Sequence, residues 1–281
     1  MRTFDKSAKL DNVLYDVRGP VVDEAAKMEE EGKEILKLNI GNPYPFGFSA
    51  PQEVILDMLS NIRTSQGYSD SKGIFSARKA IMQYAQLRNI PNVSMNDIYT
   101  GNGVSELINL CMQALLDNGD EILIPAPDYP LWTATATLAG GNVVHYVCDE
   151  QSDWYPDIDD IRSKITDKTK AIVIINPNNP TGTYVPIGEL EAFADTLPED
   201  VLLVMDEAYM EFATEPDCCS MVDYMKAHPE KPILVLRTFS KYYAMAGLRV
   251  GYALGSEELI GIMRKCSASW NLNVCAQKAA E

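Results

Sequence analysis

Short apolar runs alternate with amphipathic stretches along most of the chain. The runs are rich in Val and Ile and span residues 121–125, 143–147, 171–175, 201–205, 233–236 and 250–254. Several are continuous rather than alternating, which is typical of strands buried on both faces of a sheet. The other stretches predict helices at 51–62, 74–87, 105–116, 187–196 and 257–265. This order predicts an α/β fold, a three-layer sandwich around a mainly parallel central sheet.

The first fifty residues follow a different pattern. Residues 21–31 predict a charged helix, and residues 37–42 predict a short strand that runs into a proline-rich loop. We therefore expect residues 1–49 to form an N-terminal arm and part of a small domain. Residues 50–281 are expected to form the large domain.

Composition argues against several classes of binding partner and several kinds of catalytic site. The formal net charge of -16 argues against nucleic acid or an anionic membrane as partner. The six scattered cysteines form no CxxC pair, which predicts reduced thiols in a cytoplasmic protein. Only His145 and His228 are present, so a His-rich metal site or a Ser-His pair is not expected. We expect no signal peptide and no membrane helix, because every apolar run is far shorter than the roughly 20 residues that spanning requires.

Four polar clusters follow predicted strands directly. They are residues 101–105, 176–182, 206–209 and 238–241. In parallel α/β sheets, ligands bind at the carboxyl ends of the strands. These clusters are therefore the candidate functional site.

The first two clusters have both a functional and a purely structural interpretation. Gly101–Ser105 precedes a predicted helix, whose free N–H groups favour an anion. Glu106 replaces the third glycine of a dinucleotide motif, so an ordinary turn remains an alternative. In 176–182, two prolines and a glycine predict a fixed irregular backbone that orients the Asn179 amide. The alternative is a rigid turn.

The other two clusters carry ionisable groups. Asp206 follows a strand and could be a cleft carboxylate or only a helix cap. Lys241 lies among hydroxyl and aromatic residues, and a buried lysine with a lowered pKa is a candidate for Schiff-base chemistry. Arg249 could bind a phosphate through two hydrogen bonds. The alternative for both cations is an ordinary solvated side chain.

Taken together, the clusters resemble a known family. Asn-Pro-x-x-Pro-Thr-Gly from residue 176, Asp-x-x-Tyr from 206, Ser-Lys at 240–241 and Ala-Gly-x-Arg from 246 occur in this order. This pattern resembles the fold-type I aminotransferases of classes I and II, over essentially the whole chain. The resemblance implies a pyridoxal phosphate cofactor and a fold-type I large domain. It also implies a C-terminal small domain with an arginine for the substrate α-carboxylate, which we expect to be missing from these 281 residues.

The resemblance assigns roles around the cofactor ring. Lys241 would form the Schiff base with the cofactor aldehyde and afterwards move the proton. Asp206 would pair with the pyridine nitrogen. Tyr209 and Asn179 would contact the ring's 3-oxygen, and Tyr129 would stack on the ring.

The resemblance also implies a phosphate site, a substrate site and a homodimer. The phosphate would be held by Gly103, Val104, Ser105, Thr238, Ser240 and Arg249, and by Tyr68 from a neighbouring subunit. Asn179 and the backbone near Gly41 would meet the substrate carboxylate. Tyr15 and Arg18 are further substrate candidates, and Arg18 could bind the distal carboxylate of glutamate. A surface arginine is the alternative for Arg18.

The two halves of the chain resemble different subfamilies. The segments 16–20, 39–48, 67–79 and 125–132 are similar to bacterial glutamate-pyruvate (alanine) aminotransferases. The segments 201–212 and 236–254 are more similar to histidinol-phosphate aminotransferases. The leading expectation is an alanine/glutamate aminotransferase, and a histidinol-phosphate aminotransferase is the second. A cofactor-binding fragment without catalysis is an alternative of another class.

Overall fold

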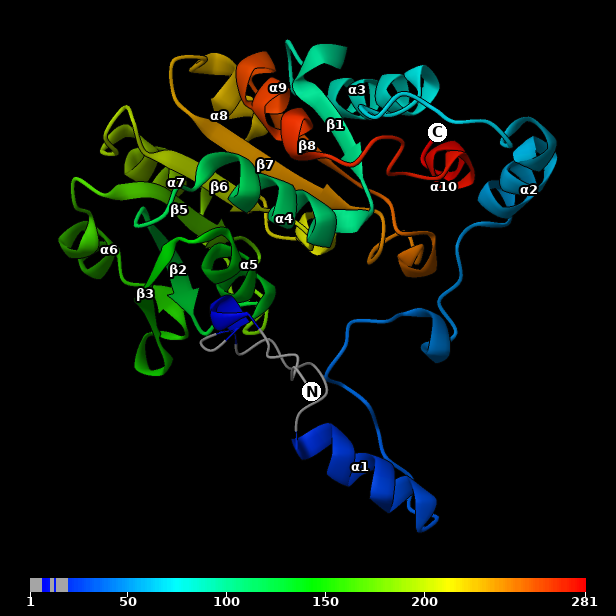
Figure 1. The fold of residues 1–281 in the computed structure, drawn as a ribbon, viewed down its shortest axis with the longest axis horizontal. Coiled ribbons are helices and arrows are strands. Elements are labelled where there is room, and N and C mark those ends of the chain that lie inside the picture. The colour runs from blue at the N-terminus through cyan, green and yellow to red at the C-terminus, as the bar shows by residue number, and fades with distance from the viewer. Residues whose placement is uncertain (1–6, 11–12, 14–19) are drawn as a thin grey trace, which may run out of the picture.

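An eight-stranded sheet forms the centre of the molecule (Figure 1). The computed structural model describes residues 7–10, 13 and 20–281. The strands are β1 (Ile98–Gly101), β2 (Glu121–Ala126), β3 (Asn142–Asp149), β4 (Tyr155–Pro156), β5 (Thr169–Ile175), β6 (Leu202–Asp206), β7 (Ile233–Thr238) and β8 (Gly251–Gly255). Their order across the sheet is β1-β8-β7-β6-β5-β2-β3-β4. Only β4 and β8 run antiparallel to their neighbours, which confirms the predicted mainly parallel sheet.

The described residues form ten α-helices. They are α1 (Pro20–Glu30), α2 (Gln52–Asn61), α3 (Phe75–Leu87), α4 (Gly103–Leu115), α5 (Leu131–Ala139), α6 (Ile158–Lys164), α7 (Ile187–Asp195), α8 (Val222–Ala227), α9 (Glu257–Cys266) and α10 (Val274–Ala279). One core joins α4, α5 and α9 to the sheet, and a second joins α3, α6, α7 and α8 to its other face. The predicted three-layer architecture is therefore confirmed.

Short 3-10 helices occupy several of the connections. They span Ala8–Leu10, Tyr44–Phe46, Ile62–Thr64, Met95–Asp97, Glu150–Ser152, Met210–Phe212 and Ala246–Leu248. Within the described residues, no helix is both long and apolar enough to cross a membrane.

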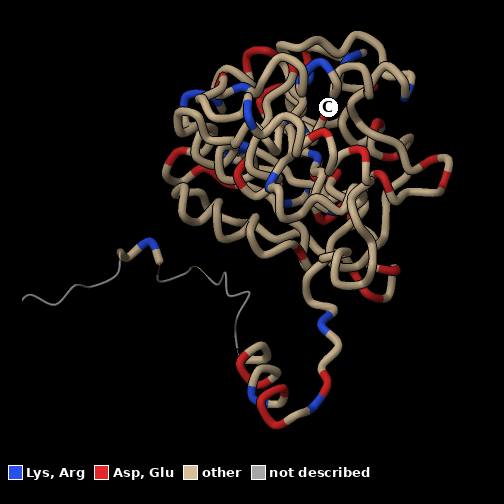
Figure 2. The backbone as a smooth tube through the Cα atoms, turned by 90° about the vertical axis from the view of Figure 1, so that its right-hand side faces the viewer, with Lys and Arg blue, Asp and Glu red and all other residues tan. Residues whose placement is uncertain are grey.

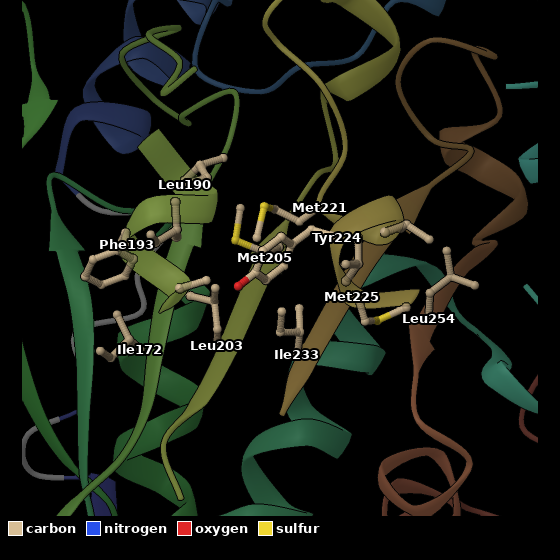
Figure 3. Packing of buried hydrophobic residues seen from close by; sticks show 14 of the residues in the cluster. Ile172, Leu190, Phe193, Leu203, Met205, Met221, Tyr224, Met225, Ile233 and Leu254 are labelled. Atoms are coloured by element: carbon tan, nitrogen blue, oxygen red, sulfur yellow. The ribbon is translucent and has the colours of Figure 1, made fainter. Parts of the chain in front are cut away.

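The central strands are buried on both faces because their apolar runs are continuous. In β6, Leu203 and Met205 pack beneath α7 and α8, whereas Leu202 and Val204 pack toward α4. Figure 3 shows the core beneath α7 and α8, where Met221 lies close to Met205. Full burial of a large aliphatic side chain contributes about 1.5–3 kcal/mol. This packing fixes the carboxyl ends of β5, β6 and β7 relative to one another.

Residues 20–49 lie largely outside this packing. Helix α1 has no buried residue and stands apart from the sheet (Figures 1 and 2). The strand predicted at 37–42 is wrong, because no strand of the described chain pairs with it and the Asn42 N–H bonds to the Ile40 carbonyl in a turn. Leu38 is 75% exposed. The apolar pattern there reflects exposed side chains rather than a half-buried strand.

Candidate active site

All four polar clusters lie around one open cleft of about 2310 Å³. They meet because β1, β5, β6 and β7 run in the same direction, so the turns that follow them lie at one edge of the sheet. Many residues expected in the site line this cleft: Gly41, Val104, Ser105, Tyr129, Asn179, Asp206, Tyr209, Thr238, Ser240, Lys241 and Arg249.

Lys241 lies in the cleft just beyond the end of β7. Its Nζ donates to the Gly41 carbonyl oxygen at 2.8 Å and lies 5.6 Å from the centroid of the Tyr209 ring. Burial lowers the pKa of the Lys241 amine, the charge of Arg249 lowers it further, and Asp206 acts in the opposite direction. A lowered pKa increases the fraction of neutral amine, which is the nucleophilic form.

Asp206 ends β6, and its side chain is only 3% exposed. The Trp132 indole Nε1–H donates to Asp206 Oδ2 at 2.9 Å, and the Ala208 backbone N–H donates to Oδ1 at 3.2 Å. Burial raises the pKa of Asp206 to about 6, against the lowering effect of these two hydrogen bonds. A carboxylate in such apolar surroundings gains strongly from a cationic partner, such as a protonated ring nitrogen.

The first turn of α4 opens into the cleft as an anion site. No side chain caps this turn, so the backbone N–H groups of Gly103, Val104 and Ser105 have no partner within the helix. The Arg249 guanidinium lies beside the turn, where its Nη2 donates to the Asn102 carbonyl oxygen at 3.3 Å. Amide donors at a helix N-terminus next to a guanidinium suit a phosphate group.

Gly103 lets Arg249 approach this closely. Gly103 has a φ of +71°, and a Cβ there would lie 2.9 Å from Arg249 Nη2. Thr238 and Ser240 add two buried hydroxyl groups to the same part of the cleft. The Ser240 backbone N–H donates to Thr238 Oγ1 at 3.1 Å, so the turn after β7 is held locally.

The 176–182 loop is fixed by its own polar side chains. The Val185 N–H donates to Asn176 Oδ1 at 2.7 Å, and Asn176 Nδ2 donates to the Val185 carbonyl at 3.2 Å. The Thr181 hydroxyl donates to Asn178 Oδ1 at 2.9 Å. The loop thereby presents Asn179 to the cleft, which Tyr129 also lines.

Two described candidates do not line the cleft directly, and two more are not described. Gly103 is not itself a lining residue, although it belongs to the first turn of α4 and lies against the Arg249 guanidinium. Tyr68 is 83% exposed and stacks on Trp270, with ring centroids 4.5 Å apart, away from this cleft. Its role at a neighbouring subunit stays a prediction. Tyr15 and Arg18 lie outside the described residues.

Comparison with known proteins gives the family. Residues 33–281 match the model of the family described as aminotransferase class I and II. The chain belongs to this family. The match covers all four polar clusters, so the family resemblance drawn from these motifs is confirmed.

Individual relatives agree with this assignment. The chain is 48% identical to the glutamate-pyruvate aminotransferase AlaA of Escherichia coli (strain K12), covering 100% of this chain and 71% of the relative. It is 39% identical to histidinol-phosphate aminotransferase 2 of Carboxydothermus hydrogenoformans over 67% of this chain and 51% of that protein. The solved alanine aminotransferase from Pyrococcus furiosus superposes with a TM-score of 0.90 at 35% identity, covering 98% of this chain and 72% of that chain. The expected fold-type I aminotransferase fold is confirmed, and relatives of both predicted kinds are present.

The donor set of the cleft fits pyridoxal phosphate. The uncapped turn of α4 and Arg249 suit its phosphate, and the buried carboxylate of Asp206 suits its pyridine nitrogen. The absence of a side chain at Gly41 keeps the Lys241 amine accessible, because a Cβ there would lie 3.1 Å from Nζ and 2.9 Å from the Tyr209 hydroxyl. The cleft therefore offers groups for each polar part of the cofactor.

Two functional neighbours of the site were missed by the sequence reasoning. Trp132 donates a hydrogen bond to Asp206. The sequence placed Trp132 in the family-like segment 125–132 but did not indicate this contact. Arg237 is buried and binds Glu207 through two hydrogen bonds. A charged residue at the end of the apolar run 233–236 was the available signal for this pair.

Replacing Arg249 is expected to weaken cofactor binding. Hydrogen bonds to charged groups contribute about 1.5–3 kcal/mol, so Arg249→Ala should weaken binding roughly ten- to a hundredfold. Arg249→Lys should lose less, because it keeps the charge but not the two-pronged geometry. Fluorescence titration with pyridoxal phosphate measures both, with Arg264→Ala on the exposed surface of α9 as control. Unchanged affinity in Arg249→Ala would remove this residue from the phosphate site.

Proposed function

We propose that this aminotransferase uses pyridoxal phosphate to move an amino group between alanine and 2-oxoglutarate, giving pyruvate and glutamate. The observation that carries the proposal is the convergence of Lys241, Asp206 and the open N-terminus of α4 in one cleft. The choice of substrates rests on the glutamate-pyruvate aminotransferase, which is 48% identical over the whole chain.

Each group then has a defined task. Pyridoxal phosphate supplies an aldehyde and a protonated ring that withdraws electrons. Lys241 would hold the cofactor through its Nζ and would carry the proton taken from the substrate Cα. Asp206 would keep the ring nitrogen protonated, and Tyr209 and Asn179 would contact the 3-oxygen. Tyr129 would pack on the ring.

The phosphate and the substrate occupy opposite parts of the cleft in this proposal. Val104, Ser105, Thr238, Ser240 and Arg249 hold the phosphate, with Gly103 supplying a backbone N–H. The Gly41 carbonyl already contacts Lys241 Nζ at 2.8 Å, which places the backbone of the arm beside the reacting atoms. Asn179 and the segment carrying Tyr15 and Arg18 complete the substrate side. Residues 50–281 form the cofactor-binding unit.

We further propose a cytoplasmic homodimer. Leu36, Leu38 and Tyr68 are 69%, 75% and 83% exposed, and a second copy would cover such apolar side chains. It would also bring Tyr68 to the partner's phosphate. A monomer in sedimentation experiments with saturating cofactor would contradict this arrangement.

The substrate assignment is tested by a direct comparison of amino donors. We expect alanine or glutamate to convert the bound cofactor to its amino form in a spectroscopic single-turnover assay, and 2-oxoglutarate or pyruvate to reverse it. Histidinol phosphate should react at least about tenfold more slowly, because no second anion site for its phosphate is evident in the described part of the cleft. A faster reaction with histidinol phosphate would reverse the assignment. Cofactor binding is measured separately, so that loss of cofactor cannot be mistaken for substrate choice.

A further inference from the structure

Three buried charged residues lie directly beneath the proposed site. Glu207, Glu211 and Arg237 have side-chain exposures of 0%, 4% and 8%. Arg237 Nε and Nη2 donate to Glu207 Oε2 at 3.0 and 2.7 Å, and Arg237 Nη1 donates to Glu211 Oε1 at 3.0 Å. We call these three residues the ionic cluster. Burying charged groups is costly, so such a cluster is weak evidence for stability alone.

The ionic cluster joins β7 to the turn that follows β6, and both carry site residues. On one side, Asp206, Tyr209 and Phe212 line the cleft, whereas the intervening Glu207 and Glu211 do not. This turn therefore carries residues of the cleft wall and interior residues side by side. A movement of the two glutamates would displace Asp206 and Tyr209.

The same division holds on β7. Thr238 lines the cleft, whereas Arg237 faces the interior and pairs in register with Tyr252 of β8. Arg237 is only four residues before Lys241. The guanidinium thus links the strand that leads to Lys241 with the turn that carries Asp206 and Tyr209.

All but one of the carboxylate oxygens in the ionic cluster accept a hydrogen bond within the described structure. Glu207 also accepts from the Ser220 hydroxyl at 2.7 Å and from the Met221 N–H at 2.8 Å, which ties in the start of α8. Glu211 Oε2 is buried and has no hydrogen-bond partner in the described part of the chain. Burial raises the pKa of Glu211, while Arg237 and then Arg88 lower it. A single guanidinium therefore holds two carboxylates, and its loss would leave both buried without their main partner.

We infer that Arg237, Glu207 and Glu211 are positioning residues, which hold Asp206 and Tyr209 at a fixed distance from Lys241. This inference rests on the proposed function, because Asp206 and Tyr209 are the residues proposed to contact the cofactor. Arg237 contacts both glutamates, and the two glutamates connect it to the turn after β6.

The control is a partly buried ion pair away from the cleft. Lys226 Nζ lies 2.7 Å from Asp97 Oδ2, with side-chain exposures of 19% and 9%, and neither residue lines the cleft. Lys226→Met removes a buried ion pair without touching the site. It therefore reports the effect of lost stability alone.

The test compares Arg237→Met, Arg237→Lys and Glu211→Gln with Lys226→Met and the unmodified chain. The readouts are pyridoxal phosphate affinity, the pH midpoint of the visible absorbance change of the bound cofactor, and amide hydrogen exchange in residues 206–214. Arg237→Met is expected to weaken cofactor affinity about tenfold or more. It should also shift the pH midpoint by about half a unit or more, because displaced Asp206 and Tyr209 change the protonation of the ring. Arg237→Lys should recover part of both effects.

Glu211→Gln keeps the oxygen that accepts from Arg237 and is the milder variant if Arg237→Met does not fold. It should accelerate exchange in residues 206–214 and shift the pH midpoint in the same direction. If the cluster variants keep the pH midpoint and exchange pattern of Lys226→Met, the cluster is structural only and the inference is overturned. In that case the unmodified chain still binds pyridoxal phosphate, and the proposed function stands. If the unmodified chain does not bind pyridoxal phosphate, the proposed function itself is wrong. The two failures are therefore distinguishable.

Discussion

Lys241→Ala is expected to abolish turnover and to prevent covalent capture of the cofactor. The Lys241 amine is placed in the cleft by its 2.8 Å contact with the Gly41 carbonyl, and its pKa is lowered chiefly by burial. It is proposed both to bind the aldehyde and to transfer the proton. General acid–base catalysis alone contributes about 10²–10⁴-fold, so the loss of rate should be at least that large.

Borohydride reduction followed by peptide mapping measures the covalent step. The unmodified chain should carry the reduced cofactor on the peptide that contains Lys241, and Lys241→Ala should carry none. Lys226→Ala is the control, because Lys226 is also partly buried but lies outside the cleft. A label on another lysine in the unmodified chain would show that the assignment of Lys241 is wrong.

The regular structure followed from the sequence wherever burial and periodicity agreed. The continuous apolar runs at 171–175 and 201–205 are the buried strands β5 and β6, because both faces of a central strand meet helices. The amphipathic stretch at 257–265 is α9, which Ser256 caps through its side chain. Their order along the chain also placed the four polar clusters at one edge of the sheet.

The missed features depend on contacts that the local pattern does not encode. Helix α5 begins at Leu131 in a segment rich in threonine, a residue that favours strands, and packing against α4 determines its conformation. The expected strand at 37–42 has no pairing neighbour among the described residues. Arg237 is buried because Glu207, far away in sequence, compensates its charge. Such long-range pairing is visible only once the fold brings β6 and β7 together.

The burial of Asp206 also couples its ionisation to the stability of the fold. Burial raises its pKa from an ordinary 3.8 to about 6, so ionisation of Asp206 disfavours the folded protein without cofactor. A group with a raised folded pKa stabilises the fold fully below its unfolded pKa, and this contribution is lost as the pH rises through about 6. The difference between pKa values of 3.8 and about 6 corresponds to roughly 3 kcal/mol.

Asp206→Asn is therefore expected to have opposite effects on stability and on chemistry. In the absence of cofactor, the neutral amide should raise the free energy of unfolding at pH 8, because no buried charge remains. The gain should be about 1–3 kcal/mol, because one hydrogen bond to Trp132 or Ala208 is weakened and offsets part of it. At pH 4 the variant and the unmodified chain should be similar, because Asp206 is then protonated in the fold. Urea unfolding at the two pH values measures this difference. An equal effect at both would show that the Asp206 charge is not what destabilises the fold.

With cofactor bound, the same variant should retain pyridoxal phosphate and lose activity. The α4 turn and Arg249 do not depend on Asp206, so cofactor affinity should fall far less than turnover. Turnover should fall about 10²- to 10³-fold, the usual effect of removing one preorganised electrostatic partner. Trp132→Phe is the graded control, because it removes only the 2.9 Å hydrogen bond to Asp206 Oδ2 and leaves the carboxylate in place. If Asp206→Asn transaminates like the unmodified chain, Asp206 only organises the turn through its bond to Ala208, and the ring nitrogen has no partner in this cleft.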